Sequence, residues 1–117
     1  MEIKKLRAAV SLIRQDIFGD IAMGQFEMFL FIADHEGVTQ PELIEVLGMS
    51  QGAISRNCAK LSSKIVRMKS GDSSSGFYEE DRGYDLIEQR QDEIDSRRKA
   101  LFLTELGKLV VEKLREI

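Results

Sequence analysis

Residues 38–61, "VTQPELIEVLGMSQGAISRNCAKL", carry the signals of two short helices joined by a tight turn. Thr39 and Glu42 have the spacing of a capping box, and a proline falls in the first turn, where its missing N–H is not needed. Gly48 suits the left-handed residue that ends a helix. A first helix is therefore predicted at about 40–47.

The second helix is predicted at about 51–63, with Ser50 as its N-cap. Ile54, Cys58 and Leu61 recur at helical spacing along it. They form the stripe that we expect to pack on the rest of the domain.

Together these segments predict a helix-turn-helix over residues 39–63. The outward face of the second helix begins with short polar side chains and becomes basic further along. Small residues would let such a helix enter a DNA major groove, polar groups would bond base edges or phosphates, and Arg56 can pair with guanine through two hydrogen bonds. The residues of this helix predicted to contact DNA are Ser50, Gln51, Gly52, Ser55, Arg56 and Lys60.

Basic residues cluster in and after this helix. From Ser50 to Lys69 there are five Lys and Arg residues and no acidic one, although the whole chain has a net charge of −3. This asymmetry favours DNA over a neutral protein partner and adds Lys64 to the predicted contacts. The alternative is that these cations only keep an exposed helix solvated.

Two further helices precede this region. Apolar residues at steps of three and four predict an amphipathic helix over 2–17. The stretch 24–37 is apolar nearly all round, which is typical of a helix at the centre of a core, and Gly37 suits its end.

The helical period is lost beyond residue 63. Residues 64–83 predict a short strand at 64–69 and then a Gly/Ser-rich turn, for which we expect partial disorder near the serines. Two strand-like runs, 84–91 and 98–104, predict a hairpin with an exposed tip. A last helix, capped by Thr104, is predicted over residues 105–117.

With the hairpin in place, the chain resembles the MarR family of winged-helix transcription regulators over about residues 20–115. The segment "VTQPELIEVLGMSQGAISRNCAKL" is similar to the helix-turn-helix of that family, and "LIEQRQDEIDSRRKALFLTELG" is similar to its wing. In the second segment the family spacing, D-P-x-D-x-R through L-T-x-x-G, is matched by Asp92, Asp95, Arg97, Leu103, Thr104 and Gly107.

The resemblance implies a mainly α (α+β) fold: a winged helix-turn-helix with a wing of two or three strands and a C-terminal helix. The wing would cover residues 84–104, and its part at 92–98 would face the DNA minor groove. Asp95 would brace the wing and Arg97 would reach into the minor groove, while Arg98 is a further candidate contact. Taken alone, this basic cluster at a hairpin could equally be solvated.

The sequence departs from the family pattern in three places. Glu93 and Ile94 stand at the wing tip in place of the usual proline and polar residue. Residues 64–83 are an insertion between the recognition helix and the wing, and they could pack on the domain, contact a partner or lie disordered. The last helix, 105–117, has only about three turns, whereas family members dimerise through long terminal helices.

A homodimer is nevertheless expected, formed through helices 2–17 and 105–117, whose apolar stripes a monomer would not fully cover. Such a dimer would read an inverted repeat with half-sites about one DNA turn apart. The resemblance further implies a small-molecule effector between these helices and the winged domain, while a protein partner is possible through the insertion at 64–83.

Composition narrows the other function classes. The single Cys58 and single His35 provide no zinc spacing, and no catalytic constellation or phosphate-binding loop is present, so no metal, no cofactor and no enzymatic activity is expected. Cys58 lies on the packing stripe, which favours an inert thiol over a redox switch. The longest apolar run is too short to span a bilayer, and a cytoplasmic protein with one domain over 1–117 and no membrane partner is expected.

We therefore expect a transcription regulator, most simply a repressor, that binds specific double-stranded DNA. Two alternatives stay open. One is a replication or mobile-element protein of a phage or plasmid that binds repeated DNA sites, and the other is a winged-helix module that binds proteins through Ile94 and "FYEED" (77–81).

Overall fold

The protein is described by a computed structural model, which covers residues 2–17, 19–62, 65–69, 77–81, 83–91, 93–95 and 97–117. Lys64 and Asp92, both singled out above, lie outside the described residues, as do the serines for which disorder was expected. Residues 65–69 and 77–81 are described by their backbone alone.

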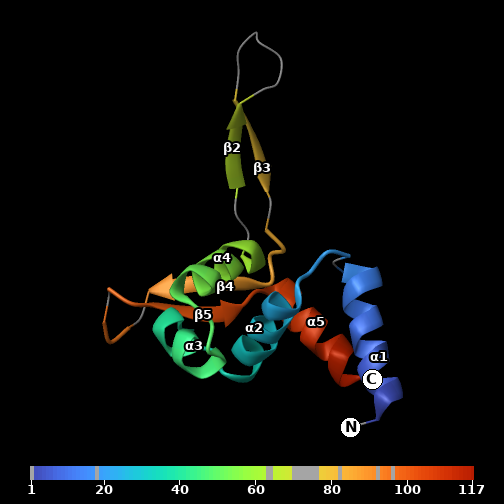
Figure 1. Cartoon of the computed structure of the whole chain (residues 1–117). Coiled ribbons are helices and arrows are strands. Elements are labelled where there is room, and N and C mark those ends of the chain that lie inside the picture. The colour runs from blue at the N-terminus through green and yellow to red at the C-terminus, as the bar shows by residue number, and fades with distance from the viewer. Residues whose placement is uncertain are drawn as a thin grey trace.

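The described part of the chain is mainly helical, with a small sheet on one side (Figure 1). The two helices of the helix-turn-helix lie in the middle of the molecule, while the first and last helices lie side by side at one end. The helical elements are α1 Ile3–Ser11, the π-helix η1 Leu12–Ile17, α2 Met23–Asp34, α3 Gln40–Leu47, α4 Gln51–Leu61 and α5 Glu105–Arg115.

The N-caps Thr39 and Ser50 act as the sequence predicts, whereas the Glu42 carboxylate pairs with Arg98 and does not complete the expected capping box. Thr39 Oγ1 accepts a hydrogen bond from the backbone N–H of Glu42 at 3.4 Å, and Ser50 Oγ accepts one from Ala53 N–H at 3.1 Å. Gly48, with φ of +68°, adopts the left-handed conformation that ends α3. The turn between α3 and α4 is therefore set by local chemistry.

The first helix differs from the prediction. One amphipathic helix was expected over 2–17, but α1 ends at Ser11 and continues as the π-helix η1. Ile13 in η1 is buried, whereas α1 has no buried residue. The apolar steps of three and four suit an α-helix throughout, so the sequence carries no sign of this switch.

Three strands form an antiparallel sheet in the order β1-β5-β4: β1 Val38–Thr39, β4 Ile87–Gln91 and β5 Lys99–Leu103. Strands β4 and β5 are the predicted wing hairpin, paired from Ile87↔Leu103 to Gln91↔Lys99. Strand β1 was not predicted, because two residues are too short to show an alternating pattern. It pairs Thr39 with Ala100 and so fastens the wing to the start of α3.

The core lies between the helices and this sheet. Its largest fully buried side chains come from α2, α3, α4, α5 and both long strands of the sheet, so the wing and the helix-turn-helix share one core. No buried side-chain N or O atom of the described residues lacks a hydrogen-bond partner. The largest of these buried side chains are Met28, Phe29, Ile32, Leu43, Ile54, Leu61, Leu86, Ile87, Leu101 and Val110.

The insertion contains a second hairpin. Strands β2 Ile65–Lys69 and β3 Phe77–Asp81 pair antiparallel in a separate two-stranded sheet. The first strand was predicted, but "FYEED" was not identified as its partner. Figure 1 shows the hairpin projecting from the body beside the end of α4.

The chain on the two sides of this hairpin is held together without it. The N–H of Tyr84 donates to the carbonyl of Lys60 at 2.8 Å, and the N–H of Leu86 donates to the carbonyl of Leu61 at 2.8 Å. These bonds join the end of α4 directly to the segment that leads into β4. The hairpin is therefore inserted at a junction that the body of the fold already fixes.

We expect the fold to tolerate removal of this hairpin. Replacement of residues 63–82 by a six-residue Gly/Ser linker should leave the free energy of unfolding within about 1 kcal/mol of wild type, because a shorter loop costs slightly less closure entropy. Urea unfolding would measure this change. Loss of a cooperative transition would show instead that the hairpin is an integral part of the domain.

Candidate nucleic-acid interface

Helix α4 has one face in the core and one face exposed. Ile54, Cys58 and Leu61 are buried, as predicted. The opposite face carries Gln51, Gly52, Ser55 and Arg56, all of them exposed. The helix is thus anchored by its apolar stripe while its short polar side chains point outward.

Arg56 folds back along its own helix toward Gly52. A Cβ atom on Gly52 would lie 3.1 Å from Nη1 of Arg56, so the guanidinium occupies the space that the missing side chain leaves. Arg56 has no ion pair with any residue that the structure describes. The first half of the outward face therefore presents an unpaired guanidinium beside small residues.

Lys60 is held at the end of α4. Its Nζ lies 5.0 Å from the ring centroid of Tyr84, a cation–π contact. The Tyr84 hydroxyl donates to Oδ1 of Asp20 at 3.0 Å, and burial together with this bond raises the pKa of Tyr84 to about 12. The lysine is thus tied to the segment between the first two helices as well as being on the predicted DNA face.

Cys58 has the environment of an unreactive thiol. It is 1% exposed, and burial raises its pKa to about 11. Because the thiolate is the reactive form, this side chain stays protonated at neutral pH.

At the wing, Asp95 holds Arg97. Asp95 Oδ1 accepts from the backbone N–H of Arg97 at 3.0 Å and from its Nε at 3.1 Å. These side-chain and backbone bonds lower the pKa of Asp95. The carboxylate therefore stays charged through the pH range in which carboxyl groups usually titrate, and the pair is lost only as the pH falls below that range. The Arg97 side chain is 89% exposed and projects from the wing.

Arg98 turns the other way, toward α3. Its Nη2 lies 3.1 Å from Thr39 Oγ1 and 3.2 Å from Glu42 Oε1. The sequence placed this arginine with the DNA contacts, whereas the structure gives it partners inside the protein. No local signal reveals this pairing, because the two ends of the ion pair are 56 residues apart.

The wing tip exposes one large apolar side chain beside a charged one. Ile94 is 96% exposed, next to the exposed Glu93. A pocket of about 390 Å³ lies below the tip, lined in part by Arg90, Ile94 and Phe102.

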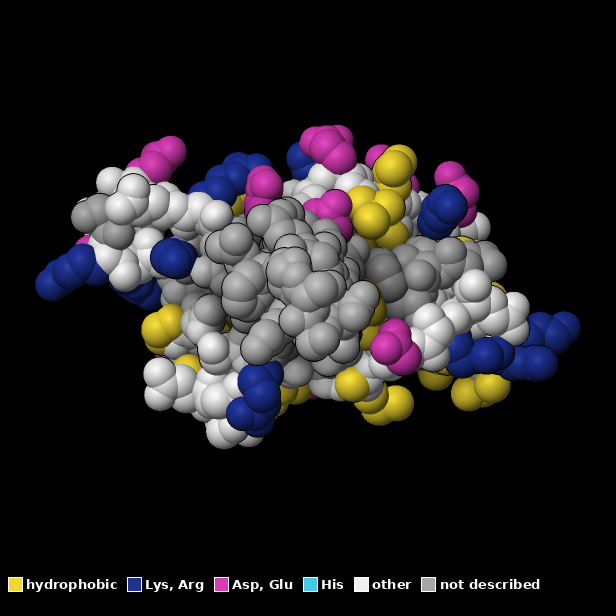
Figure 2. Space-filling model, turned by 90° about the horizontal axis from the view of Figure 1, so that it is seen from above, with side chains coloured by type: hydrophobic (Ala, Val, Ile, Leu, Met, Phe, Trp, Pro, Cys, Tyr) yellow, Lys and Arg dark blue, Asp and Glu magenta, His cyan; other side chains and the backbone are white. Residues whose placement is uncertain are grey.

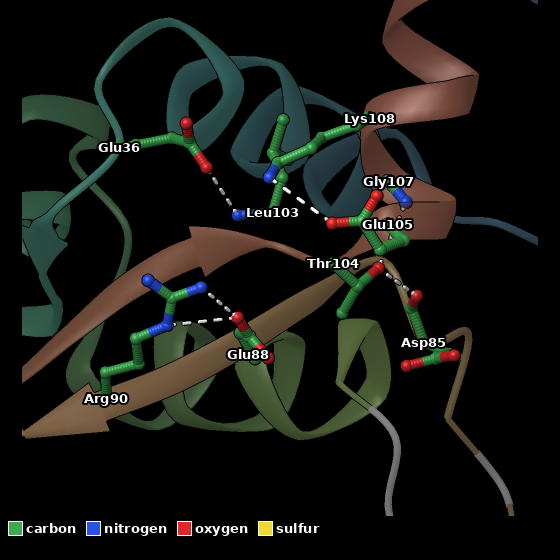
Figure 3. Close-up of polar contacts among 9 residues, drawn as sticks. All are labelled: Glu36, Asp85, Glu88, Arg90, Leu103, Thr104, Glu105, Gly107 and Lys108. Atoms are coloured by element: carbon green, nitrogen blue, oxygen red, sulfur yellow. Dashed lines mark hydrogen bonds and ion pairs between the residues drawn. The ribbon is translucent and has the colours of Figure 1, made fainter.

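Figure 3 shows polar contacts along β4 and at the base of the wing. Arg90 pairs with Glu88 on β4, and Nε of Arg90 lies 3.0 Å from Oε1 of Glu88. Glu36 Oε1 accepts from the N–H of Leu103 at 2.9 Å. Since β1 starts only at Val38, which pairs with Leu101, this carboxylate takes the place of a backbone partner at the end of β5.

Thr104 joins α5 to the segment before β4. Its Oγ1 donates to the carbonyl of Asp85 at 2.6 Å and accepts from Gly107 N–H at 3.0 Å (Figure 3). Asp85 has φ of +57°, a left-handed conformation that Asp tolerates better than most residues. The predicted cap of the last helix thus also fixes the path of the chain into the wing.

Charge is unevenly distributed around the α4 side of the molecule. Figure 2 looks onto this side. Most Asp and Glu side chains lie along its upper edge, while Lys and Arg side chains lie at both ends of the view and also at its upper and lower edges.

In the described ranges, no group of three or more His, Cys, Asp and Glu residues is placed to hold a metal ion. None of the described helices is both long and apolar enough to cross a membrane. A groove of about 620 Å³ separates the first and last helices, lined by Ala8, Ser11, Leu12, Gln15, Lys113, Glu116 and Ile117.

Comparisons with known proteins point to one family and one fold. Residues 20–64 match the model of the MarR family. A search of curated protein sequences finds no match.

Solved structures resemble nearly the whole chain, at 97% coverage in each case below. The crystal structure of MarR is similar with a TM-score of 0.60 and 21% identity, over 71% of that chain. The Staphylococcus aureus MepR–DNA complex gives a TM-score of 0.66 at 19% identity over 75% of that chain. Streptococcus pneumoniae FabT in complex with DNA gives 0.62 at 19% identity over 64% of that chain.

Proposed function

We propose that this chain, which has the winged-helix fold of MarR-type regulators, is a transcription regulator that binds specific double-stranded DNA. The observation that carries the proposal is the exposed face of α4, where Arg56, with no ion pair among the described residues, lies beside small polar residues on a helix anchored in the core. The DNA present in the MepR and FabT structures supports such a role for this fold.

In this proposal α4 enters the major groove and the wing approaches the adjacent minor groove. Arg56 pairs with a guanine, while Gln51 and Ser55 bond base edges or phosphates. Arg97, held by Asp95 and highly exposed, is the residue that reaches the minor groove. Binding across a promoter would repress transcription by excluding polymerase, and no enzymatic step or cofactor is needed.

We further propose that the active form is a homodimer. Apolar side chains on the first and last helices remain exposed, among them Ile3 at 77% and Leu109 at 58%. A second copy would cover them and would place two α4 helices about one DNA turn apart. The groove between α1 and α5 then lies next to the dimer contact, where a small-molecule effector would alter it. Such a regulator would act in the cytoplasm, with the DNA.

Selection of bound fragments from the genome of the source organism, at about 150 mM salt, tests this function, because that salt suppresses purely electrostatic binding. We expect wild type to enrich a few inverted repeats that overlap promoters. Arrays of adjacent repeats would instead indicate a replication or mobile-element protein. No enrichment would contradict the proposal, and negligible affinity at low salt would favour a protein partner.

A further inference from the structure

The junction between the wing and the helix-turn-helix is very short. Strand β1 contributes only two residue pairs to β5, Val38↔Leu101 and Thr39↔Ala100, and then ends because α3 begins at Gln40. Between α4 and the wing the chain passes through the β2–β3 insertion. Among the described residues, backbone pairing therefore gives the part of the wing nearest its tip no direct link to α3.

Arg98 provides that link through its side chain. It lies two residues before Ala100, on the wing-tip side of the last β1–β5 pair. Its Nη2 contacts Thr39 Oγ1 at 3.1 Å and Glu42 Oε1 at 3.2 Å, so one guanidinium reaches both the N-cap and the first turn of α3. Its backbone N–H donates to the carbonyl of Asp95 at 3.0 Å.

Of the two residues that Arg98 contacts at the start of α3, Thr39 is held firmly in place. Thr39 is 2% exposed, pairs with β5, and caps α3 through the same oxygen that accepts from Arg98. Arg98 and Glu42 are about half exposed, which limits the strength of the ion pair but leaves its geometry anchored on a buried residue.

We propose that Arg98 is a positioning residue for DNA binding: through Glu42 and Thr39 it sets the wing at a fixed place relative to α3 and α4. Arg97, the adjacent residue, is then presented to the minor groove while α4 occupies the major groove. This inference rests on the proposed function and assigns Arg98 a role inside the protein rather than on the phosphates.

A direct DNA contact by Arg98 and a positioning role for it predict opposite effects of Glu42→Gln on DNA affinity. If Arg98 bound DNA directly, Glu42 would compete for it, and Glu42→Gln would tighten binding. If Arg98 positions the wing, Glu42→Gln weakens binding even though it removes a negative charge, which by itself would favour DNA. A direct phosphate contact would also lower the salt dependence of binding by about one counterion when Arg98 is removed.

The experiment measures affinity for the selected DNA site and for a random duplex, at several salt concentrations, in Arg98→Gln, Glu42→Gln and the double variant. We expect each single change to weaken specific binding about threefold to fivefold, as for the loss of one exposed pair. The double variant should bind no more weakly than either single one, and the salt slope should stay that of wild type. Asp34→Asn, which removes an exposed carboxylate at the end of α2, is the matched control for Glu42→Gln and should bind no more weakly than wild type does.

The charge swap Glu42→Arg/Arg98→Glu keeps the net charge and should restore most of the lost affinity, which a general loss of stability would not do. Unfolding curves would verify that every variant is folded. Tighter binding by Glu42→Gln, or a reduced salt slope in Arg98→Gln, would overturn the positioning role and make Arg98 a direct contact. Absence of any wild-type binding would refute the proposed function itself, and this role with it.

Discussion

Gly107→Ala is expected to lower the free energy of unfolding by about 3 kcal/mol, a large part of the stability of a small domain. A Cβ on Gly107 would lie 2.2 Å from the carbonyl oxygen and 3.2 Å from the carbonyl carbon of Leu86. Both atoms belong to the backbone of the segment before β4, so no rotation of a side chain relieves the clash. Helix α5 would have to move away, against the two hydrogen bonds that Thr104 makes at this place.

Urea unfolding of Gly107→Ala beside Gly24→Ala would measure this effect. Gly24 lies in α2, and a Cβ there would meet Met49 Cε at 3.4 Å and Asn57 Nδ2 at 3.8 Å, both ordinary contacts with side chains. We expect this control to be neutral or to stabilise by up to about 1 kcal/mol, because alanine favours a helix over glycine. A loss below about 1 kcal/mol in Gly107→Ala would contradict the close approach of α5 to Leu86.

The second large effect is expected for Arg56→Ala. Loss of an arginine that pairs with guanine should weaken binding at the best site by about 1–3 kcal/mol and relax base preference at one position of each half-site. Stability should not change, because Arg56 is exposed and its guanidinium makes no ion pair with the described residues. Titration of the selected site, single-base variants of it and random DNA would measure both quantities.

Lys60→Ala is the comparison for this prediction. A lysine that contacts phosphates contributes about equally to every sequence, so its removal should weaken specific and random DNA alike. If Arg56→Ala also lost equal affinity on specific and random DNA, the assignment of α4 to the major groove would be wrong.

The local signals of the sequence predict the helix-turn-helix well. Thr39, Ser50 and Thr104 cap helices in the structure, and Gly48 ends one with a positive φ, because each acts through atoms a few residues away. The stripe of Ile54 and its neighbours on α4 is buried for the same reason, since helical spacing alone defines a face.

Features that depend on distant partners could not be predicted in this way. Strand β1 exists because two residues meet β5, and β3 exists because "FYEED" meets β2. The motif glycine Gly107 was found by its spacing, but its physical reason, contact with the backbone of Leu86, appears only in three dimensions.

In the candidate site too, features set by nearby residues could be predicted and features set by distant partners could not. The outward face of α4 follows from helical spacing, and the structure exposes Gln51, Gly52, Ser55 and Arg56 together. The different directions of Arg97 and Arg98 do not follow from a basic run on a hairpin. They depend on Asp95 beside one and on Glu42 beside the other.

The most direct test of the account is dimethyl sulfate interference on the selected DNA site, with wild type and Arg56→Ala compared. This reagent methylates guanine N7 in the major groove and adenine N3 in the minor groove, so one experiment reports on both α4 and the wing. We predict that methylation of one guanine in each half-site blocks wild type but not Arg56→Ala, and that adenines on the flank of each half-site interfere with both. If no guanine N7 interferes with wild-type binding, or if the pattern is the same in both proteins, then α4 does not read the major groove through Arg56.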